Sequence, residues 1–369
     1  MQPDQAHVAP GMPPLHHDGK TVSFFEFWPM WLMYIPVGLQ WLVLACRYRS
    51  LTLPLIANPK LPVSGMVGVG KSQVMEQAVG CCAESILPWI HHCINQKPLE
   101  QQAADVIVQA RALGIKYPFV CKPDLGCRGS GVKLIHDVHQ LEHYLAAYPQ
   151  GIGVIVQKLA TWEPEAGVFY VRSPDDSAGR IVSLALKYSP YVIGDGVSTL
   201  AELIARDRRA GNLQHLYSER HQDRLLDVIE AGKSFRLVFS ITHSRGGIFR
   251  DGNYLITPEL TNSINRLMSG MPEFHYGRLD IKFSNIERLQ QGRDIEIVEI
   301  NTASAESLHI WDRNARLGTA LKTLLWQYRT LFRFGQINRK RGFVPPKISE
   351  VRDRWREEKQ VAAFYPLTD

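Results

Sequence analysis

The sequence has few cysteines, and their spacing gives them no shared role. The 369 residues include six cysteines, none in a CxxC pair, and no stretch resembles a secretory cleavage site. A disulfide-stapled mini-protein is therefore excluded, and a reducing compartment is expected. Apolar residues make up 45% and charged residues 21%, which also excludes whole-chain disorder and collagen. At about 150 residues per domain, the length predicts two or three domains.

Internal repeats and zinc-binding spacings are also missing. Strand-like and helix-like runs follow one another without repetition, which predicts an α+β or α/β protein. One cluster of cysteines and histidines fits no standard zinc pattern, so we expect no metal there. Its members are Cys81, Cys82, His91, His92 and Cys93.

The net charge of +6 is unevenly distributed. Residues 313–359 hold thirteen Lys and Arg against four Asp and Glu, a balance of +9, so the remainder is near −3. A basic segment on a near-neutral body predicts contact with an anionic surface, either phospholipid headgroups or nucleic acid, although a solvated helix face is the alternative. No nucleic-acid-binding motif accompanies the charge, so no nucleic-acid partner is expected. Residues 336–369 are interpreted as a basic C-terminal tail.

The first fifty residues combine a proline-rich stretch with a long uncharged run. Residues 1–22 show no apolar periodicity and predict a disordered tail. Within an apolar, membrane-associated segment at 23–50, residues 27–46 are twenty residues without a charge, about the length that spans a bilayer core. Pro36 and Gly38 interrupt the run. A spanning helix, an interfacial or re-entrant hairpin, and a segment packed on the protein's own core are therefore all retained.

The flanks of this run bear on localisation. Trp and Tyr, which are typical of the membrane–water interface, are frequent in its first half, and Arg47 and Arg49 follow it directly. If the run spans a membrane, the positive-inside rule places the rest of the chain on the cytoplasmic side. We expect association with the cytoplasmic side of the inner membrane, or otherwise a cytoplasmic protein.

A glycine-rich loop between two predicted strands has the composition of a phosphate cradle. The first strand ends at Lys122, and the loop contains Gly126, Gly129, Ser130 and Gly131. Glycines let backbone N–H groups approach a polyphosphate, the serine adds a hydroxyl, and the lysine supplies a compact positive charge. Glycine-rich hairpins are common, so this loop alone is weak evidence.

Two later strands carry acidic and amide side chains at alternate positions. Arg278 and Asp280 share one face of the first strand, and Glu299 and Asn301 share one face of the second. If the strands are neighbours, two carboxylates and an amide oxygen converge, and these are the hard ligands that Mg²⁺ prefers. Arg278 can then neutralise charge on a transferring phosphoryl group or an oxyanion. A solvated polar strand face is the alternative.

The order of these parts resembles the ATP-grasp superfamily, and D-alanine–D-alanine ligases most closely, over residues 65–330. The motifs that carry the resemblance are the Lys122 strand with its loop, the GRLD motif that ends at Asp280, and the VEIN motif that ends at Asn301. The resemblance implies an α+β ATP-grasp fold, in which two subdomains clasp ATP. These would be residues 116–190, with the loop and hinge, and residues 191–335, with the metal site, after a reduced region at 51–115.

The resemblance also implies a role for individual residues. Lys122 and the glycine loop would hold the ATP phosphates, and Arg278 would stabilise the transition state. Two Mg²⁺ ions, with Mn²⁺ as an alternative, would bind Asp280, Glu299 and Asn301. Less direct matches are Gln157, Lys158 and Leu159 for the adenine hinge, Glu165 for the ribose, and Lys187 as a further catalytic lysine beside the phosphates. Residues 192–203 are similar to a stretch of cyanophycin synthetase, another ATP-grasp enzyme.

A second glycine motif at 65–72 matches the P-loop pattern G-x-x-x-x-G-K-S. The residues before it include two prolines and make a poor strand, which argues against a P-loop. The spacing to Lys122 instead resembles that of an early ATP-grasp lysine, so Lys71 is expected to contact ATP. Residues 242–247, Glu306 and His309 are further candidates for contact with the substrate.

The resemblance implies an ATP-dependent carboxylate–amine ligase. Such an enzyme activates a carboxylate as an acyl phosphate, releases ADP and phosphate, and couples the acyl group to an amine. The reduced N-terminal region and the apolar segment suggest small-molecule or lipid-linked substrates at an anionic membrane surface. An ATP-grasp phosphotransferase and a non-catalytic nucleotide-binding membrane protein are the alternatives. After Asn301, residues 303–306 lack the Pro-Gly of the ligase family, which leaves the D-alanine substrate open.

Overall fold

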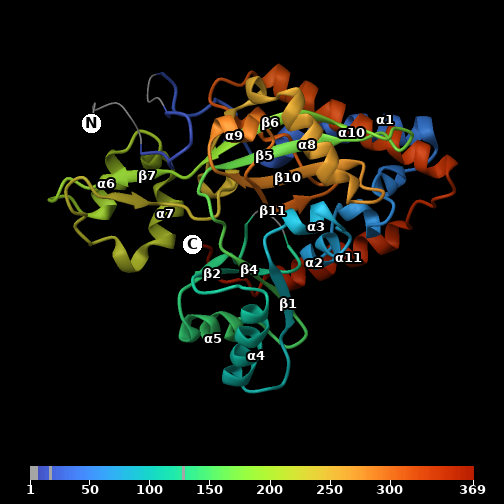
Figure 1. Ribbon diagram of the computed structural model, residues 1–369. Coiled ribbons are helices and arrows are strands. Elements are labelled where there is room, and N and C mark those ends of the chain that lie inside the picture. Colours follow the sequence, from blue (N-terminus) through green and yellow to red (C-terminus); the bar gives the residue numbers. More distant parts are fainter. Residues whose placement is uncertain (1–6, 16–18, 127–128) are drawn as a thin grey trace.

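A four-stranded antiparallel sheet with two helices on one face forms the lower body of the molecule in Figure 1. Its strand order is β1–β4–β2–β3. Val154 and Val156 of β4, with Phe119 and Cys121 of β2, are buried in one cluster under the helices, as the alternation of strand side chains requires. The elements are β1 (Trp89–Cys93), α4 (Leu99–Ala112), β2 (Phe119–Pro123), β3 (Lys133–Ile135), α5 (Val138–Ala146) and β4 (Gly153–Lys158).

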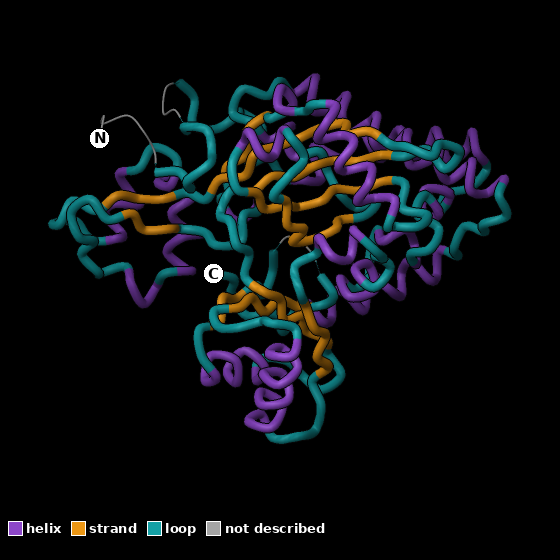
Figure 2. The backbone as a smooth tube through the Cα atoms, viewed as in Figure 1, coloured by secondary structure: helices purple, strands orange, loops and turns teal. Residues whose placement is uncertain are grey.

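A five-stranded antiparallel sheet in the order β11–β10–β5–β6–β9 forms the larger body (Figure 2). Central strand β5 is buried along its whole length. Val168 and Tyr170 pack in the cluster that includes α8, whereas Phe169 and Val171 pack in the cluster that includes α10. The elements are β5 (Glu165–Val171), β6 (Arg180–Tyr188), β9 (Ile248–Asp251), α8 (Pro258–Ser269), β10 (Tyr276–Phe283), α9 (Ile286–Gln290), β11 (Ile295–Asn301) and α10 (Leu317–Lys340).

A smaller module projects from the larger sheet at the left of Figure 1. It comprises β7 (Tyr191–Ile193), α6 (Leu200–Arg206), α7 (Gln214–Arg220) and β8 (Ser234–Arg236). Helix α6 begins with a capping box between Thr199 and Glu202. Strand β8 ends at Arg236, because its partner β7 provides only three residues to pair with.

The N-terminal region packs against the larger sheet. This computed structural model describes residues 7–15, 19–126 and 129–369. The sequence predicts a disordered tail at 1–22, of which residues 1–6 and 16–18 lie outside the described residues; within the described part, Met12 and Leu15 are buried in the main core cluster. The phenol of Tyr188 donates a 3.2 Å hydrogen bond to the carbonyl of Pro13. The short helices α2 (Lys71–Met75) and α3 (Cys81–Ser85) follow further along the chain.

The uncharged run forms one helix, α1 (Met30–Tyr48), with Pro36 inside it. Helix α1 lies beside α10, and its buried residues are Met33, Val37 and Leu44 (Figure 1). By length and composition, α1 is able to cross a membrane. Because α1 packs on α10, it also fits the alternative of a segment held against the protein's own core. The run is a single helix, so it does not form a hairpin.

The sheet topology moves the expected domain boundaries. Strands β5 and β6 were assigned to a subdomain at 116–190, but they pair within the sheet of β10 and β11. Strand β1, from the region assigned to 51–115, pairs with β4. The tail expected at 336–369 begins inside α10 and continues as α11 (Ile348–Ala362). Pairing between distant strands decides these boundaries, and local sequence patterns do not encode it. The α+β class is confirmed.

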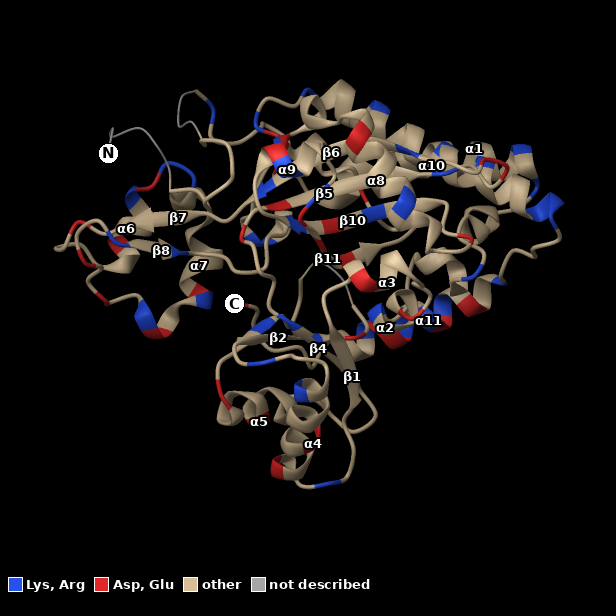
Figure 3. Ribbon diagram, in the orientation of Figure 1, with Lys and Arg blue, Asp and Glu red and all other residues tan. Residues whose placement is uncertain are grey.

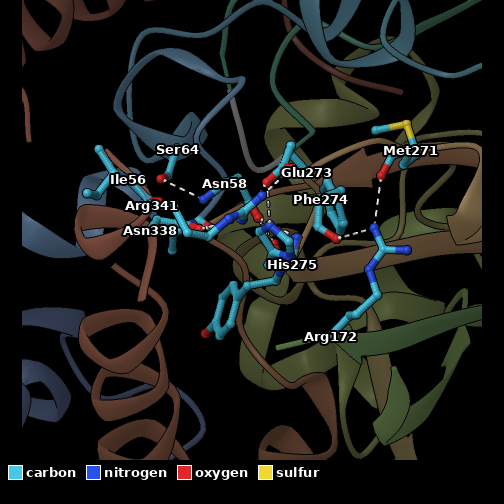
Figure 4. A network of polar contacts seen from close by, with 12 residues as sticks. Ile56, Asn58, Ser64, Arg172, Met271, Glu273, Phe274, His275, Asn338 and Arg341 are labelled. Atoms are coloured by element: carbon cyan, nitrogen blue, oxygen red, sulfur yellow. Dashed lines mark hydrogen bonds and ion pairs between the residues drawn. The ribbon is translucent and has the colours of Figure 1, made fainter. Parts of the chain in front are cut away.

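A buried polar network ties residues 56–64 to the larger sheet and to α10 (Figure 4). The Asn58 side chain donates to the Tyr276 carbonyl at 2.8 Å and accepts from the backbone N–H groups of His275 and Tyr276. The Asn338 amide donates to the Ile56 carbonyl at 2.8 Å. These bonds satisfy backbone groups that lie outside sheet ladders, and so fix the start of β10.

Candidate functional site

The polar residue pairs of β10 and β11 lie between the two bodies of the molecule. We call this part of the two strands the shared wall. Their register places Arg278 opposite Asn301 and Asp280 opposite Glu299. The Asp280 carboxylate accepts bonds from Arg278 at 2.7 and 3.2 Å and from the Asn301 amide at 3.2 Å, and Lys187 lies 3.5 Å away. The two strands are therefore neighbours and bring together the carboxylates and the arginine that the sequence singles out.

These charges stabilise one another in a buried setting. Burial alone would raise the pKa of Asp280, but Arg278 and Lys187 lower it to about 2. Burial would lower the pKa of Lys187, but Asp280 and Glu165 raise it above the usual lysine value. The carboxylate and both cations are therefore ionised at neutral pH, and their charge is fixed before any substrate binds.

One cavity of about 570 Å³ lies between the four-stranded sheet and this wall. The predicted phosphate and hinge residues line it, and so do Trp162, Arg236 and Phe239, which the sequence analysis does not single out. The predicted residues here are Lys71, Lys122, Gly129, Ser130, Gln157, Lys158, Leu159, Glu165, Lys187, Asp280 and Glu299.

Lys122 is almost completely buried in this cavity. Its ammonium donates to the Gln157 side chain at 2.8 Å and to the Val298 carbonyl at 3.2 Å. Burial lowers its pKa to about 8, although Glu299 acts in the opposite direction. A lysine with so little water around it gains most from an anionic ligand.

The described glycines of the loop adopt backbone conformations that other residue types rarely adopt. Gly126, Gly129 and Gly131 have positive φ angles of 124°, 65° and 69°, which favour glycine. The Ser130 hydroxyl accepts a 2.9 Å bond from Arg245, which comes from the opposite body. Cys127, in the middle of the loop, lies outside the described residues. The loop therefore reaches across the cleft.

Lys71 belongs to the site, although the residues before it do not form a P-loop. The residues before it form a turn of 3₁₀ helix (Pro62–Gly65), and α2 is only five residues long. Its ammonium donates to the Gly126 carbonyl at 2.7 Å and lies 3.9 Å from Glu299. Lys71 thus links the glycine loop to the acidic wall.

The predicted hinge and ribose residues have partners within the protein. The Gln157 side chain faces Lys122, and the Lys158 backbone N–H is donated to the Pro88 carbonyl. The Glu165 carboxylate is paired with Lys187 and, at 2.9 Å, with Lys282. Glu165 lines the first cavity while it pairs with these two lysines, so its role toward a ribose stays a prediction. Lys282 shares the strand face of Asp280, so the same alternation would have pointed to it.

A second cavity of about 510 Å³ lies on the other side of the shared wall. Lys71, Lys187, Asp280 and Glu299 line both cavities, and Arg278 and Asn301 line this one. Its remaining lining is mixed: Phe27, Trp28, Met30, Phe249 and Trp311 contribute apolar and aromatic surface, and polar side chains such as Glu26, Ser304 and Glu358 lie among them.

The other candidate substrate contacts divide between two places. Glu306, Thr242, His243 and Ser244 line the second cavity. His309 lines a separate shallow hollow beside α10, because the 3₁₀ turn that contains it (Leu308–Trp311) directs it away from the cavity. The expectation for His309 is therefore wrong.

Asp280, Glu299 and Asn301 fit a magnesium ion by the chemistry of their donor atoms. All three provide oxygen, and Glu299 remains partly accessible beside the cavity. Among the described residues, no group of three or more His, Cys, Asp or Glu is placed to hold a metal alone. A divalent ion here would therefore need further oxygen ligands, which phosphates supply.

Comparison with known proteins gives structural likenesses only. No protein-family model matches the chain, and no curated protein matches it. D-alanine–D-alanine ligase of Bacillus anthracis is 13% identical with a TM-score of 0.39, over 76% of this chain and 72% of that one. The VanG D-Ala:D-Ser ligase of Enterococcus faecalis is 11% identical with a TM-score of 0.39, over 73% and 62%.

A bifunctional glutathione synthetase of Pasteurella multocida is 15% identical with a TM-score of 0.34, over 70% of this chain. The chain spans only 35% of that synthetase. At these TM-scores the likenesses carry no argument about activity, which has to come from the site itself.

Proposed function

We propose that the protein is an ATP-dependent carboxylate–amine ligase. The observation that carries the proposal is the wall shared by two cavities. Arg278, Asp280, Glu299 and Asn301 lie on paired strands between a cavity with buried Lys122 and a second cavity with polar side chains and an aromatic group of its own. A nucleotide in the first cavity and an acceptor in the second would meet at these charges.

In the proposed reaction, an oxygen of the substrate carboxylate attacks the γ-phosphorus of ATP. The bond from this phosphorus to the β–γ bridging oxygen breaks, ADP leaves, and an acyl phosphate forms. An amine nitrogen then attacks the acyl carbon, loses a proton to solvent, and displaces inorganic phosphate. Positioning and charge neutralisation dominate catalysis of such transfers.

The chain's own residues supply that neutralisation. Lys122 and Lys71 would hold the phosphate oxygens, and Arg278, oriented by Asp280, would face the oxygen that gains charge. A magnesium ion bound by Asp280, Glu299 and Asn301 would supply further neutralisation of the γ-phosphate. Closure of the glycine loop would exclude water and protect the acyl phosphate.

We place the reaction at the cytoplasmic face of the inner membrane, where ATP is available. Support comes from α1, whose outward residues are apolar, which has Arg47 in its last turn, and which Arg49 directly follows. Because its inner face packs on α10, α1 fits a position along the membrane surface better than a free span.

The test is magnesium-dependent ADP release from detergent-purified protein, with pooled carboxylates and hydroxylamine as the amine. Trapped hydroxamate is the expected product, and Glu299→Gln should abolish it. Glu287→Gln, an exposed acid on α9, is the matched control. ADP release that yields a stable phosphorylated product and no hydroxamate would overturn the ligase in favour of a phosphotransferase.

A further inference from the structure

Helix α1 carries an exposed apolar stripe along its outward face. Trp31, Ile35, Leu39 and Leu42 follow the helical spacing, with Val43 beside them, and the most exposed of them are 67% accessible. Phe24 and Phe27 extend the stripe before the helix begins. Contiguous apolar surfaces of this kind are rare on soluble monomers and mark contact with a partner or a membrane.

The inner face of α1 is fixed to the protein by polar and aromatic contacts. The Gln40 amide donates to the Leu325 carbonyl at 2.9 Å, and the Trp41 ring meets Phe332 edge-on at 5.3 Å. The Tyr34 phenol donates to the Glu306 carboxylate. These contacts hold the helix on α10, so the stripe is a stable outer surface of the folded protein.

The charges around the stripe suit an anionic bilayer. From residue 27 to residue 46 the chain has no charge, and then Arg47 and Arg49 follow. Arg339 of α10 joins them by donating to the Tyr48 carbonyl at 2.9 Å. An apolar stripe with arginines at its end is typical of helices that lie in the headgroup region, with apolar side chains toward the acyl chains. Blue arginine and lysine segments are visible at this end of α1 and α10 in Figure 3.

The same segment continues into the second cavity. Phe27, Trp28 and Met30, at the start of α1, line the cavity that also contains Arg278 and Glu306. Phe27 stacks on His243 at 5.7 Å, and His243 stacks on Trp311 at 4.2 Å, which gives the cavity an aromatic wall. The segment directly before the stripe therefore also contributes apolar side chains to the cavity that contains Arg278.

We propose that the stripe of α1 docks on an anionic phospholipid bilayer, and that the second cavity takes from it an amphiphilic carboxylate. The apolar part of this substrate would lie along Phe27, Trp28 and Met30, with its carboxylate toward Arg278. The substrate class rests on the proposed ligase function, whereas the docking does not.

Docking is tested by flotation of the full-length protein with vesicles of phosphatidylglycerol and phosphatidylcholine. The wild type should float with these vesicles, and the double variant Leu39→Glu/Leu42→Glu should bind roughly tenfold more weakly or worse. The control is Leu226→Glu, which also replaces an exposed leucine with a charge. Leu226 is 86% exposed and lies on the smaller module that contains α6 and α7, so this variant should float like the wild type. Circular dichroism would establish that all variants are folded.

Two results would overturn the docking. One is equal flotation of the double variant and the wild type. The other is a self-association of the wild type in detergent-free buffer that the double variant loses, without any vesicle binding, because the stripe would then cover a second copy of the chain. Weaker flotation on phosphatidylcholine alone is expected from the arginines, and salt should reduce the difference.

The substrate class is tested by hydroxamate formation from carboxylates of increasing chain length. Yield should rise with chain length when the acids are presented in vesicles, and the double variant should lose that gain while keeping its yield with a water-soluble short acid. A yield that is independent of chain length would overturn the amphiphilic substrate. If no acid of any length gives hydroxamate, the ligase proposal fails, while the flotation result still decides the docking.

Discussion

The hydroxyl of Thr368 donates a 2.7 Å hydrogen bond to the carbonyl of Gly129, and so connects the last residues of the sequence to the glycine loop. Asp369 extends this contact. Its carboxylate accepts from the Leu134 N–H at 2.8 Å, and its main-chain oxygen accepts from the N–H groups of Phe239 and Ser240. The segment thus bonds the loop side of the cleft to the opposite body.

Loss of this link should loosen the glycine loop. Thr368→Val keeps the shape of the side chain but removes the donor, at a cost of about 1 kcal/mol. We expect faster amide hydrogen exchange in residues 129–134 and a several-fold faster release of ATP. Thr368→Ser, which retains the hydroxyl, is the control. Identical exchange in the two variants would show that the loop is held by other contacts.

ATP affinity should depend on pH through Lys122. Its pKa is about 8 in the free protein, and the phosphates favour its charged form, so binding raises this pKa. Affinity should therefore be constant below about pH 7 and fall as pH rises through 8, by at most about tenfold per pH unit. Isothermal titration calorimetry measures this directly.

The arginine variant distinguishes Lys122 from other titrating groups. In Lys122→Arg the charge persists at all these pH values, so the decline should flatten even if the absolute affinity is lower. A decline of the same size in Lys122→Arg would assign the pH dependence to a group elsewhere in the complex.

Much of the site follows from strand periodicity. Alternation alone places Arg278 with Asp280, and Glu299 with Asn301, and the structure adds only that the two strands are neighbours. The loop glycines can adopt their positive φ angles because they have no Cβ. Local patterns succeed here because the side-chain direction in a strand is fixed by the backbone.

Long-range contacts are what the sequence did not reveal. The pairing of Glu165 with Lys187 and Lys282 depends on β5 lying between β6 and β10. The burial of Met12 and Leu15 and the docking of Thr368 also depend on surfaces made by distant segments. Such contacts have no local periodicity, and a proline-rich or basic composition therefore suggested tails at both ends.

Asn58 should matter more to stability than its place in an irregular segment suggests. Its side chain bonds three backbone groups at the start of β10, and only 1% of its surface is exposed. Asn58→Ala would leave these buried groups without partners and should lower the free energy of unfolding by about 2–3 kcal/mol. Lys60→Ala, at a nearby exposed side chain, should be close to neutral in the same urea titration. Equal midpoints for the two variants would contradict the importance of the network.

Substitution of the two acidic residues of the shared wall should lower the free energy of unfolding by different amounts. Asp280 is buried between Arg278 and Lys187, so Asp280→Asn would leave two buried cations with too little negative charge and should cost about 3 kcal/mol. Glu299 is 29% exposed and only 3.9 Å from Lys71, so Glu299→Gln should cost less than about 1 kcal/mol. Both variants should lack turnover.

Because the pKa of Asp280 is lowered to about 2, its stabilising contribution is present above about pH 4 and is lost as pH falls toward 2. The difference in unfolding midpoint between wild type and Asp280→Asn should therefore shrink over that interval. A stability gap for Asp280→Asn that persists unchanged at pH 2 would assign the loss to packing instead of charge.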